Sequence, residues 1–396
     1  MPAKVTPRRL ADMLDAGEEF VLLDTRGDES YDSWHVRGAE QFPFGADEEL
    51  TDDRKAELDA LLDGRDRIVT ICAKGVTSDH FAEELSEAGY DVAVVTGGME
   101  AWSQVYDAVP VETDGPAEIV QVQRRAKGCL GYVVADPETG EAGVVDATRH
   151  AAEFRAVADE RDWEITRVFD THVHADHVSG GRELAAELGV PYHLSEAARE
   201  RDVTYDFAPL GRNEAVEVGD VQLKALRVPG HTTESVNLLV NREAVLTADT
   251  LHVGSVGRTE LESEAQRASD SRAAEPRDGG DEDAAAGARM QYESLHRTVL
   301  AEPDDLAVLP GHVEVTSDGE FAHGAPGEPV RATVGEARTT FDLLQLAEDE
   351  FVERLTAGDQ EKPPSFERII AVNRGAESVE QSEATEMEMG PNNCSA

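Results

Sequence analysis

The segment 171–177 constrains this chain more than any other part of the sequence. It holds three histidines and an aspartate, and it directly follows an apolar, strand-like segment at 165–170. Imidazoles and a carboxylate grouped at the end of a strand occupy a small volume, and these groups are the usual protein ligands of zinc and iron. A chance polar loop with solvated histidines is the alternative, and the apolar strand before it argues against that. The candidate ligands are His172, His174, Asp176 and His177.

Three further candidate ligands follow at wide intervals. His231, Asp249 and His312 each come shortly after an apolar segment with the length of a strand. A lone histidine is more often structural or solvated, so each of these residues is weak evidence by itself. Four metal-type segments that all follow strands are hard to attribute to chance, because ligand sites form where strand ends meet. The pattern predicts one metal centre built from distant parts of the chain.

Cys72 marks a second candidate site, since it lies between a strand-like and a helix-like segment. This arrangement would place the thiol beneath backbone N–H groups and the positive end of a helix, which favours the reactive thiolate. The same loop could hold the anionic sulfur of a persulfide. A buried structural cysteine is the alternative, and the loop alone leaves both interpretations open. The expected cradle consists of Ala73, Lys74, Gly75, Val76, Thr77 and Ser78.

Acidic residues outnumber basic ones by 82 to 36, which gives a net charge of −46. A disordered acidic chain is one interpretation, but apolar segments alternate with Gly and Pro turns along most of the sequence and predict a folded protein. An acidic surface suits a salt-loving source, because concentrated salt shortens the Debye length to about 3 Å and screens self-repulsion. Such a surface repels nucleic acid and anionic membranes, so neither is an expected partner.

The three cysteines are too few and too scattered for a disulfide framework. We therefore expect Cys129 to be a small apolar filler and Cys394 to be a tail thiol. No apolar run approaches the roughly 18 residues that a membrane span needs, and no secretion signal is visible at the start. These features predict a cytoplasmic protein, and they leave the oligomeric state open, a homo-oligomer included.

Two domains are expected from the order of the segments. Strand-like and helix-like segments alternate through residues 1–110, which predicts an α/β domain with a parallel sheet covered by helices on both faces. Residues 111–116 are rich in Pro and Gly and are expected to be a linker. A hairpin-rich domain follows at 117–376. Within it we expect an acidic, mobile insertion at 262–288, and after it a disordered tail at 377–396.

Residues 1–106 resemble the rhodanese family. The resemblance rests on the segments 24–26, 35–39 and 97–102, which occur in the family's order. It implies sulfur transfer through a persulfide on Cys72. Family members often carry an arginine near the end of the loop, where this chain has Thr77. Lys74 could supply the charge instead, so the resemblance leaves the sulfur donor open.

Residues 117–375 resemble the metallo-β-lactamase superfamily, through the histidine-rich segment and the three later ligand candidates. The resemblance implies an αββα sandwich with the metal at the strand ends between its halves. It implies one metal position formed by His172, His174 and His231. It implies a second position formed by Asp176, His177 and His312, with Asp249 able to bridge.

Two branches of that superfamily compete. Thioesterases of the glyoxalase II type hold two metal ions, here two zinc ions, and hydrolyse acyl-thiols with a metal-bound hydroxide. Persulfide dioxygenases hold one Fe(II) per chain in a facial triad, here His172, His231 and Asp249. They oxidise a low-molecular-weight thiol persulfide with O₂ to sulfite. In that case His174, Asp176, His177 and His312 would support the ligands without binding the metal.

The sequence after Asp249 resembles the dioxygenase branch, with Glu260 where that branch has an aspartate. This implies a substrate-binding role for Arg258, and an ordinary surface arginine is the alternative. A persulfide-oxidising domain and a rhodanese domain share sulfane sulfur, with sulfite or thiosulfate as partners, whereas a thioesterase has no evident use for Cys72. We therefore expect a persulfide dioxygenase with a sulfurtransferase domain. The other alternative is a non-catalytic sulfur carrier or sensor.

Overall fold

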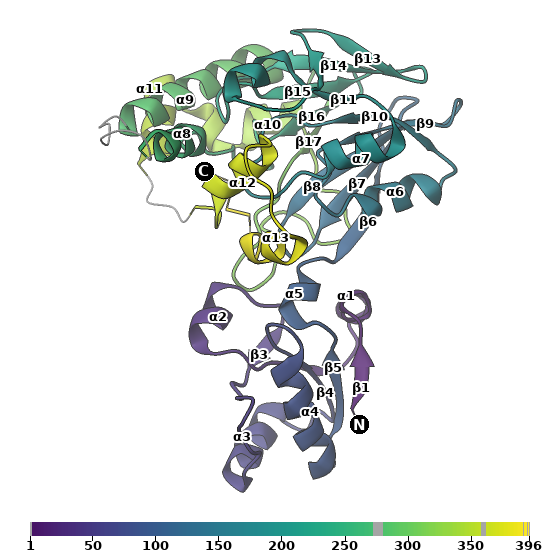
Figure 1. Ribbon diagram of the computed structural model, residues 1–396, viewed down its shortest axis with the longest axis vertical. Helices are drawn as coiled ribbons and strands as arrows, with labels where there is room; N and C mark the ends of the chain where they lie inside the picture. Colours follow the sequence, from purple (N-terminus) through teal and green to yellow (C-terminus); the bar gives the residue numbers. More distant parts are fainter. Residues whose placement is uncertain (1, 272–279, 358–361, 391, 394, 396) are drawn as a thin grey trace.

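The computed structural model describes residues 2–271, 280–357, 362–390, 392, 393 and 395 of the chain, and two domains are stacked along its long axis (Figure 1). The first domain has a five-stranded parallel sheet in the order β1-β5-β4-β2-β3. The strands are β1 (Ala3–Val5), β2 (Val21–Asp24), β3 (Ala39–Gln41), β4 (Arg67–Ile71) and β5 (Asp91–Val95). The helices are α1 (Pro7–Asp15), α2 (Asp28–Ser33), α3 (Asp52–Leu62), α4 (Val76–Ala88) and α5 (Gly98–Trp102).

Both faces of this sheet are buried, which confirms the predicted α/β domain. Side chains alternate between the two faces of a strand, so neighbouring residues join different cores. Leu22 packs in a core with α1 and α5, whereas Leu23 packs in a core with α3 and α4. A sheet covered on both sides leaves function to its loops and strand ends.

The second domain consists of two facing sheets. The first sheet contains β12-β11-β10-β9-β8-β7-β6, and the second contains β13-β14-β15-β16-β17-β18. Strands of the first sheet are β6 (Tyr106–Val111), β7 (Glu118–Arg124), β8 (Cys129–Asp136), β9 (Glu141–Val145), β10 (Glu164–Phe169), β11 (Tyr192–Ser195) and β12 (Ala208–Leu210). Strands of the second are β13 (Ala215–Val218), β14 (Val221–Arg227), β15 (Val236–Val240), β16 (Ala244–Ala248), β17 (Ala307–Pro310) and β18 (Ala332–Thr333).

The main core lies between the two sheets, where Tyr132 and Phe169 of one meet Leu238 and Leu309 of the other. Helices α6 (Ala151–Asp159) and α7 (Gly181–Leu188) cover the outer face of the first sheet. On the other side, buried residues of α10 (Val334–Thr340) and α11 (Glu348–Thr356) pack against the second sheet, and α9 (Gly280–Ser294) contacts α11. The remaining helices are α8 (Leu261–Ser271), α12 (Phe366–Asn373) and α13 (Gln381–Met387). This arrangement confirms the predicted αββα sandwich.

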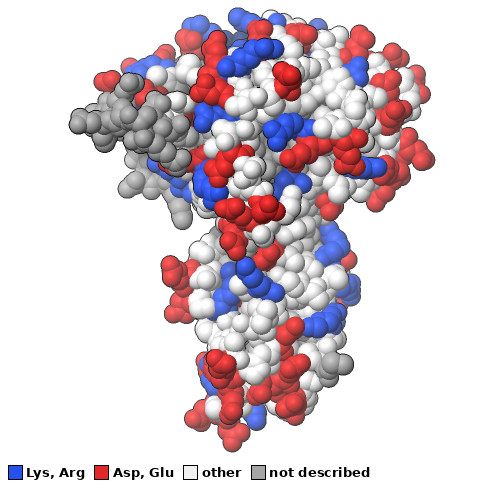
Figure 2. Space-filling model, in the orientation of Figure 1, with Lys and Arg blue, Asp and Glu red and all other residues white. Residues whose placement is uncertain are grey.

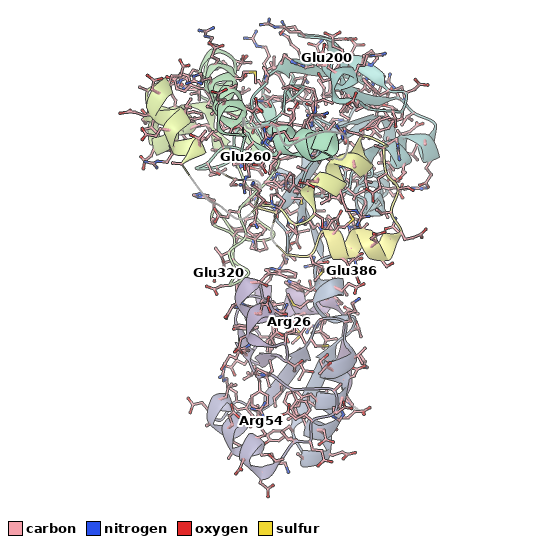
Figure 3. All side chains as sticks on the ribbon, turned by 60° about the vertical axis from the view of Figure 1, so that its left-hand side comes forward. Arg26, Arg54, Glu200, Glu260, Glu320 and Glu386 are labelled. Atoms are coloured by element: carbon pink, nitrogen blue, oxygen red, sulfur yellow. The ribbon has the colours of Figure 1, made fainter. Side chains whose placement is uncertain are left out.

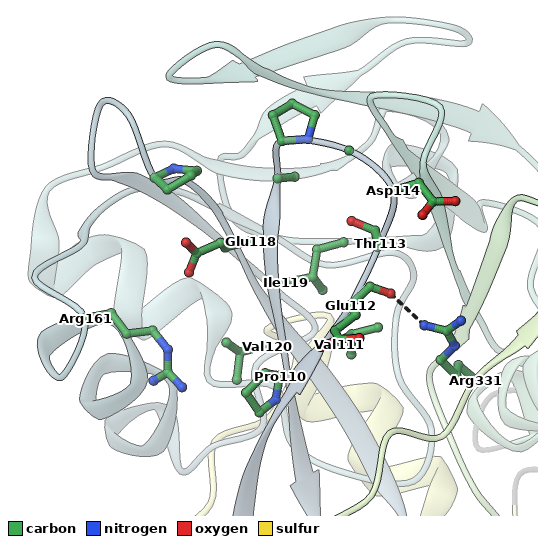
Figure 4. Close-up of a pocket in the computed structure, with 14 residues that line it drawn as sticks. Pro110, Val111, Glu112, Thr113, Asp114, Glu118, Ile119, Val120, Arg161 and Arg331 are labelled. Carbon is green, nitrogen blue, oxygen red and sulfur yellow. Dashed lines mark hydrogen bonds between the residues drawn. The ribbon is translucent and has the colours of Figure 1, made fainter.

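The predicted linker is wrong, because 111–116 lies inside the second domain. β6 pairs with β7 in an antiparallel hairpin, and residues 112–117 form the turn between them. Pro110 is compatible with this pairing because β6 is the edge strand, where a missing N–H breaks no ladder. The turn lines a surface pocket of about 670 Å³, closed on one side by Arg331, whose Nη1 donates to the Glu112 carbonyl at 2.6 Å (Figure 4).

The predicted disordered tail is also wrong for the part of 377–396 that the structure describes. Helix α13 lies at the junction of the two domains, with Glu386 facing the first domain (Figures 1 and 3). Glu388 is fully buried and accepts hydrogen bonds from Arg124 and Arg149. The polar composition of this segment suggested disorder, whereas the side chains of Glu386 and Glu388 have partners far away in the sequence.

The predicted insertion at 262–288 overlaps most of α8 and the first part of α9, and residues 272–279 lie outside the described part. Its many Ala, Glu and Arg residues favour helix without needing an apolar stripe. No helix among the described residues is long and apolar enough to cross a bilayer. Acidic side chains are spread over the visible face of both domains (Figure 2).

Candidate metal centre

The candidate ligands lie in loops that follow four strands of the second domain. The segment 171–177 follows β10, His231 follows β14, Asp249 follows β16, and His312 follows β17. β16 and β17 are parallel neighbours, so Asp249 and His312 leave the same edge of their sheet. The backbone of Val236 also donates to the Thr171 carbonyl at 3.0 Å, which joins the two sheets beside the histidine-rich segment.

Three unpartnered atoms converge at the centre. The Nε2 atoms of His172 and His231 lie 3.8 and 3.4 Å from Oδ2 of Asp249. All three side chains are at most 2% exposed, and none of these three atoms has a hydrogen-bond partner. A buried polar atom without a partner costs about 1–3 kcal/mol, so their convergence is typical of a cation site. Two imidazoles and one carboxylate form this group among the described residues, and such a set suits Fe(II), while zinc accepts the same donors.

Both imidazoles are oriented by contacts on their far side. His231 has its Nδ1 2.6 Å from the carbonyl oxygen of Arg258, to which only a protonated Nδ1 can donate. The Nδ1 of His172 lies 2.9 Å from Oγ1 of Thr171. Burial and the neighbouring His174 hold the pKa of His172 well below its usual 6.5, which keeps the ring neutral. Neutral rings whose Nε2 atoms face one carboxylate oxygen are prepared for a metal ion.

A second group lies beside the first. It consists of Cys129, Asp176, His177 and His312, whose possible ligand atoms lie within 4.8 Å of one another. Asp176 is the hub of this group, with Oδ1 3.0 Å from Nδ1 of His177 and Oδ2 2.9 Å from Nε2 of His312. The Nδ1 of His312 lies 2.5 Å from Oδ1 of Asp249 and so joins the two groups.

The sequence suggested that Cys129 is a small apolar filler, whereas the structure places its thiol in this polar group. Its Sγ lies 3.3 Å from Oδ2 of Asp176, and the residue is 2% exposed. Nothing in the local sequence marks it, because it begins a strand of mostly apolar residues. Its place beside Asp176 follows only from the pairing of the start of β8 with the loop that carries His312.

His174 lies at the edge of the centre and belongs to a third group. Its Nε2 is 3.2 Å from Oδ1 of Asp146, and Asp170 lies in the same group. Its Nδ1 has no partner, so this atom remains available on the side of the other histidines. Sequence reasoning missed Asp146 and Asp170. The rule that found the other candidates would have found them, since each directly follows a strand.

Arg258 is 5% exposed, so the alternative of a surface arginine is wrong. Its Nε donates to Glu260 at 2.6 Å and its Nη1 donates to the Asn393 carbonyl at 3.2 Å. Its own carbonyl orients His231, as described above. A contact between the Arg258 side chain and a substrate stays a prediction.

Two of the six residues expected to cradle Cys72, Gly75 and Ser78, contact its thiol. The Sγ of Cys72 accepts hydrogen bonds from the Gly75 N–H at 3.1 Å and the Ser78 hydroxyl at 3.2 Å, and α4 begins immediately after Gly75. Gly98 approaches so closely that a Cβ there would lie 2.1 Å from the Cys72 carbonyl oxygen. Lys74 forms ion pairs with Glu100 and with Glu386 of α13. The loop can therefore stabilise negative charge on a sulfur atom.

Asn373 holds the histidine-rich loop in place. Its Nδ2 donates to the carbonyls of His174 and His177 at 2.9 and 2.8 Å, and its Oδ1 accepts from the Ser179 N–H. We expect Asn373→Ala to weaken metal binding by about 10- to 100-fold, the usual effect of losing a group that supports ligands. Titration against a competing chelator measures this affinity. Asn213→Gly, in a distant turn, should leave it unchanged, and equal affinities in both variants would contradict the assigned role.

Comparison with known proteins agrees with both halves of the fold. Residues 6–105 match the rhodanese-like domain family, and residues 125–312 match the metallo-β-lactamase superfamily. The chain is therefore a rhodanese domain followed by a metallo-β-lactamase-fold domain, and an enzyme of the metallo-β-lactamase superfamily.

Individual relatives cover the second domain. A hydroxyacylglutathione hydrolase of Rhodopseudomonas palustris (strain ATCC BAA-98 / CGA009) is 29% identical over 240 residues, which is 60% of this chain and 82% of that protein. The structure of a metallo-β-lactamase from Staphylococcus aureus subsp. aureus COL has a TM-score of 0.56 at 22% identity, covering 67% of this chain and 75% of its own. ETHE1 from Myxococcus xanthus has a TM-score of 0.52 at 22% identity, covering 65% and 98%. Both structures share the fold.

Proposed function

We propose that this protein oxidises a low-molecular-weight thiol persulfide to sulfite at one Fe(II), and that it transfers sulfur through Cys72. The observation that carries the proposal is the pairing of two sites in one molecule. One site has three unpartnered ligand atoms, on His172, His231 and Asp249, and the other is a cradled thiol. A three-ligand set of two imidazoles and a carboxylate is characteristic of Fe(II) oxygenases.

The overall reaction consumes one persulfide, one O₂ and one water, and it releases thiol, sulfite and two protons. Bound Fe(II) would supply the redox chemistry that joins the outer sulfur to oxygen. The protein supplies a dry site, because every candidate ligand is at most 2% exposed. A dry site strengthens electrostatic interactions and excludes competing hydrolysis.

His312 would stabilise the negative charge of Asp249, the carboxylate among the three ligands. It lies between Asp249 and Asp176, with one ring nitrogen near each. Burial opposes a charge on this ring, but the two carboxylates outweigh it and raise the pKa of His312 well above its usual value. A charged His312 holds Oδ1 of Asp249 and leaves Oδ2 facing His172 and His231.

Cys72 would carry the second activity. A persulfide on Cys72 passes its outer sulfur to sulfite, so that thiosulfate forms and the Cys72 thiolate is left. The Gly75 N–H and the Ser78 hydroxyl stabilise the sulfur anion on both sides of this step. Arg258 would bind an anionic group of the persulfide, since its carbonyl oxygen contacts the ring of the candidate ligand His231.

A binuclear thioesterase is the second candidate. Two observations favour it, namely the likeness to a hydroxyacylglutathione hydrolase and the second ligand group next to the first. That function leaves Cys72 without a task in the reaction. The non-catalytic sulfur carrier is the third candidate, and it would turn over less than one equivalent in every assay.

The deciding experiment uses the full chain, purified without oxygen. Iron is quantified, and O₂ consumption is followed with the persulfides of glutathione and of cysteine as probes. We expect one iron per chain and one O₂ consumed per persulfide. Hydrolysis of an acyl-glutathione thioester without any persulfide-dependent O₂ uptake would refute the proposal in favour of the thioesterase.

Replacement of Cys72 by serine should separate the two activities. We expect Cys72→Ser to abolish thiosulfate formation from sulfite, because the sulfur has no carrier, and to leave O₂ uptake within about two-fold of the parent. Thiosulfate is measured after incubation with persulfide and sulfite. Ser86→Ala, on the same helix as Ser78, is the control and should retain both activities. Unchanged thiosulfate formation in Cys72→Ser would rule out the assigned role.

A further inference from the structure

A pocket of about 660 Å³ lies where the edge of the first sheet of the second domain meets the second sheet. Arg227 and Val236 in its wall form the last cross-strand pair of β14 and β15, before the hairpin loop 228–235 that carries His231. Glu200, also in the wall, lies at the end of the second domain that points away from the first domain (Figure 3). The pocket is therefore close to a loop of the metal centre and remote from the Cys72 site.

Five charged side chains line this pocket, and none of them forms an ion pair with any residue that the structure describes. They are Arg199, Arg212, Arg227, Glu196 and Glu200. Most arginines in the described part of the chain do have a carboxylate partner. Charges of both signs that line one pocket without neutralising each other are available to a ligand that carries both charges.

Arg227 is the most firmly held of these residues. It is half-buried, and its guanidinium donates to Oγ of Ser195 at 3.2 Å and to the carbonyl oxygen of Thr233. Both acceptors are neutral, so they orient the side chain without compensating its charge. Arg199 is oriented differently, because its guanidinium lies over the ring of Phe207, 5.3 Å from the ring centre. The two guanidiniums are thus positioned without a carboxylate.

We propose that this pocket binds a small molecule with two carboxylates and one ammonium group, that is, an acidic amino acid or an acidic short peptide. The planar fork of an arginine matches a carboxylate with two parallel hydrogen bonds, and a glutamate accepts from an ammonium group. The apolar side chains of Leu210 and Val236 line the same pocket and can contact the carbon skeleton. The volume is in the usual range for small-molecule sites.

The arginines are needed because the whole chain has a net charge of −46 and repels acidic molecules at long range. The two glutamates provide selectivity. They repel a ligand that has only carboxylates, while the three arginines repel a ligand that has only ammonium groups.

This inference does not rest on the proposed function. None of the residues that line the pocket belongs to the candidate metal-ligand groups, so binding requires neither iron nor O₂. Absence of binding here and absence of persulfide oxidation are therefore separate results.

Isothermal titration calorimetry of the full chain at low ionic strength tests the proposal, with glutamate, glutathione and citrate as probes. We expect saturable binding of glutamate and of glutathione, one molecule per chain, and weaker binding of citrate. The double variant Arg199→Gln/Arg212→Gln should bind glutamate at least about 10-fold more weakly, because charged hydrogen bonds are lost. Both side chains are exposed, so the fold should persist.

The control is Arg354→Gln on α11, which removes another exposed arginine that has no ion pair among the described residues. Its affinity for glutamate should equal that of the parent. Absence of saturable glutamate and glutathione binding to the parent, or equal affinities in the double variant and the control, would overturn the proposal.

A second double variant tests the role of the negative charges. Glu196→Gln/Glu200→Gln should weaken binding of glutamate and strengthen binding of citrate, because the acceptors for the ammonium group and the repulsion of the third carboxylate are both lost. Citrate that binds the parent as tightly as glutamate does, or affinities for both probes that fall together in this variant, would show that the pocket does not recognise an ammonium group and would overturn the proposal.

Discussion

Replacing His231 with alanine should abolish persulfide-dependent O₂ uptake and leave sulfur transfer through Cys72 intact. His231 contributes one of the three unpartnered atoms that face each other at the centre. Loss of a group that merely supports a ligand lowers affinity or activity by about 10- to 100-fold, so loss of a ligand should exceed about 100-fold. O₂ uptake and thiosulfate formation are measured on the same preparation.

The control for this variant is His296→Ala. His296 lies outside the candidate ligand groups and packs against Tyr292. Its replacement should leave both activities unchanged. Retained sulfur transfer in His231→Ala shows that the first domain is folded. A circular dichroism spectrum like that of the parent shows the same for the second domain, so that the loss of O₂ uptake reports on the metal centre. Undiminished O₂ uptake in that variant would remove the triad from the mechanism.

Glu388→Ala should destabilise the second domain by about 3–5 kcal/mol, because it leaves buried positive charge without a counter-ion. The Oε2 of Glu388 accepts from Arg124 at 2.7 Å and Arg149 at 3.0 Å, and its Oε1 accepts from the Val178 N–H at 2.7 Å. Arg124 and Glu388 are fully buried. Urea unfolding followed by circular dichroism measures the change.

Glu386→Ala is the matched control, since Glu386 is two residues away, exposed, and paired only at the surface with Lys74. An exposed ion pair contributes about 0–1 kcal/mol, so this variant should unfold close to the parent. Equal unfolding midpoints for both variants would show that the buried ion pair does not stabilise the domain.

The contribution of Glu388 should also depend on pH. Burial raises the pKa of this carboxyl, but Arg124 and Arg149 outweigh burial and lower the pKa from 4.5 to about 2. A group whose pKa is lower in the folded state stabilises fully above its unfolded pKa and loses its effect as pH falls towards the folded value. The difference in the free energy of unfolding between the parent and Glu388→Ala should therefore be constant near neutrality. It should decrease as the pH falls from about 4.5 to 2. A difference that increases on acidification would contradict this account.

The position of the metal centre could be predicted from the sequence because its candidate ligands all follow strand-like segments. Side chains that follow neighbouring strands meet at one edge of a sheet, so His231, Asp249 and His312 could be placed together before any coordinates. The structure brings them together with His172 at the junction of the sheets. Their role as ligands stays a prediction, as does the identity of the metal.

Other parts of the centre could not be predicted, since they depend on contacts between distant segments. Cys129 becomes informative only when β8 lies beside the loop of His312, 183 positions later in the chain. Glu388 lies 264 positions from Arg124. The polar sequence around Glu388 therefore predicts an exposed segment, because the sequence does not show that Arg124 is its partner. Asp146 and Asp170 are different, because their strand-end positions were visible in the sequence and were overlooked.

The hairpin of β6 and β7 has a consequence for handling the protein in pieces. A protease that cuts the exposed turn at 112–117 would not release two independent halves, because the strand before the cut stays hydrogen-bonded to the strand after it. A shortened protein that starts at 117 would present the bare edge of β7 to other molecules and invite strand-to-strand association. Separate study of the two domains therefore requires division of the chain near residue 105, before β6 begins.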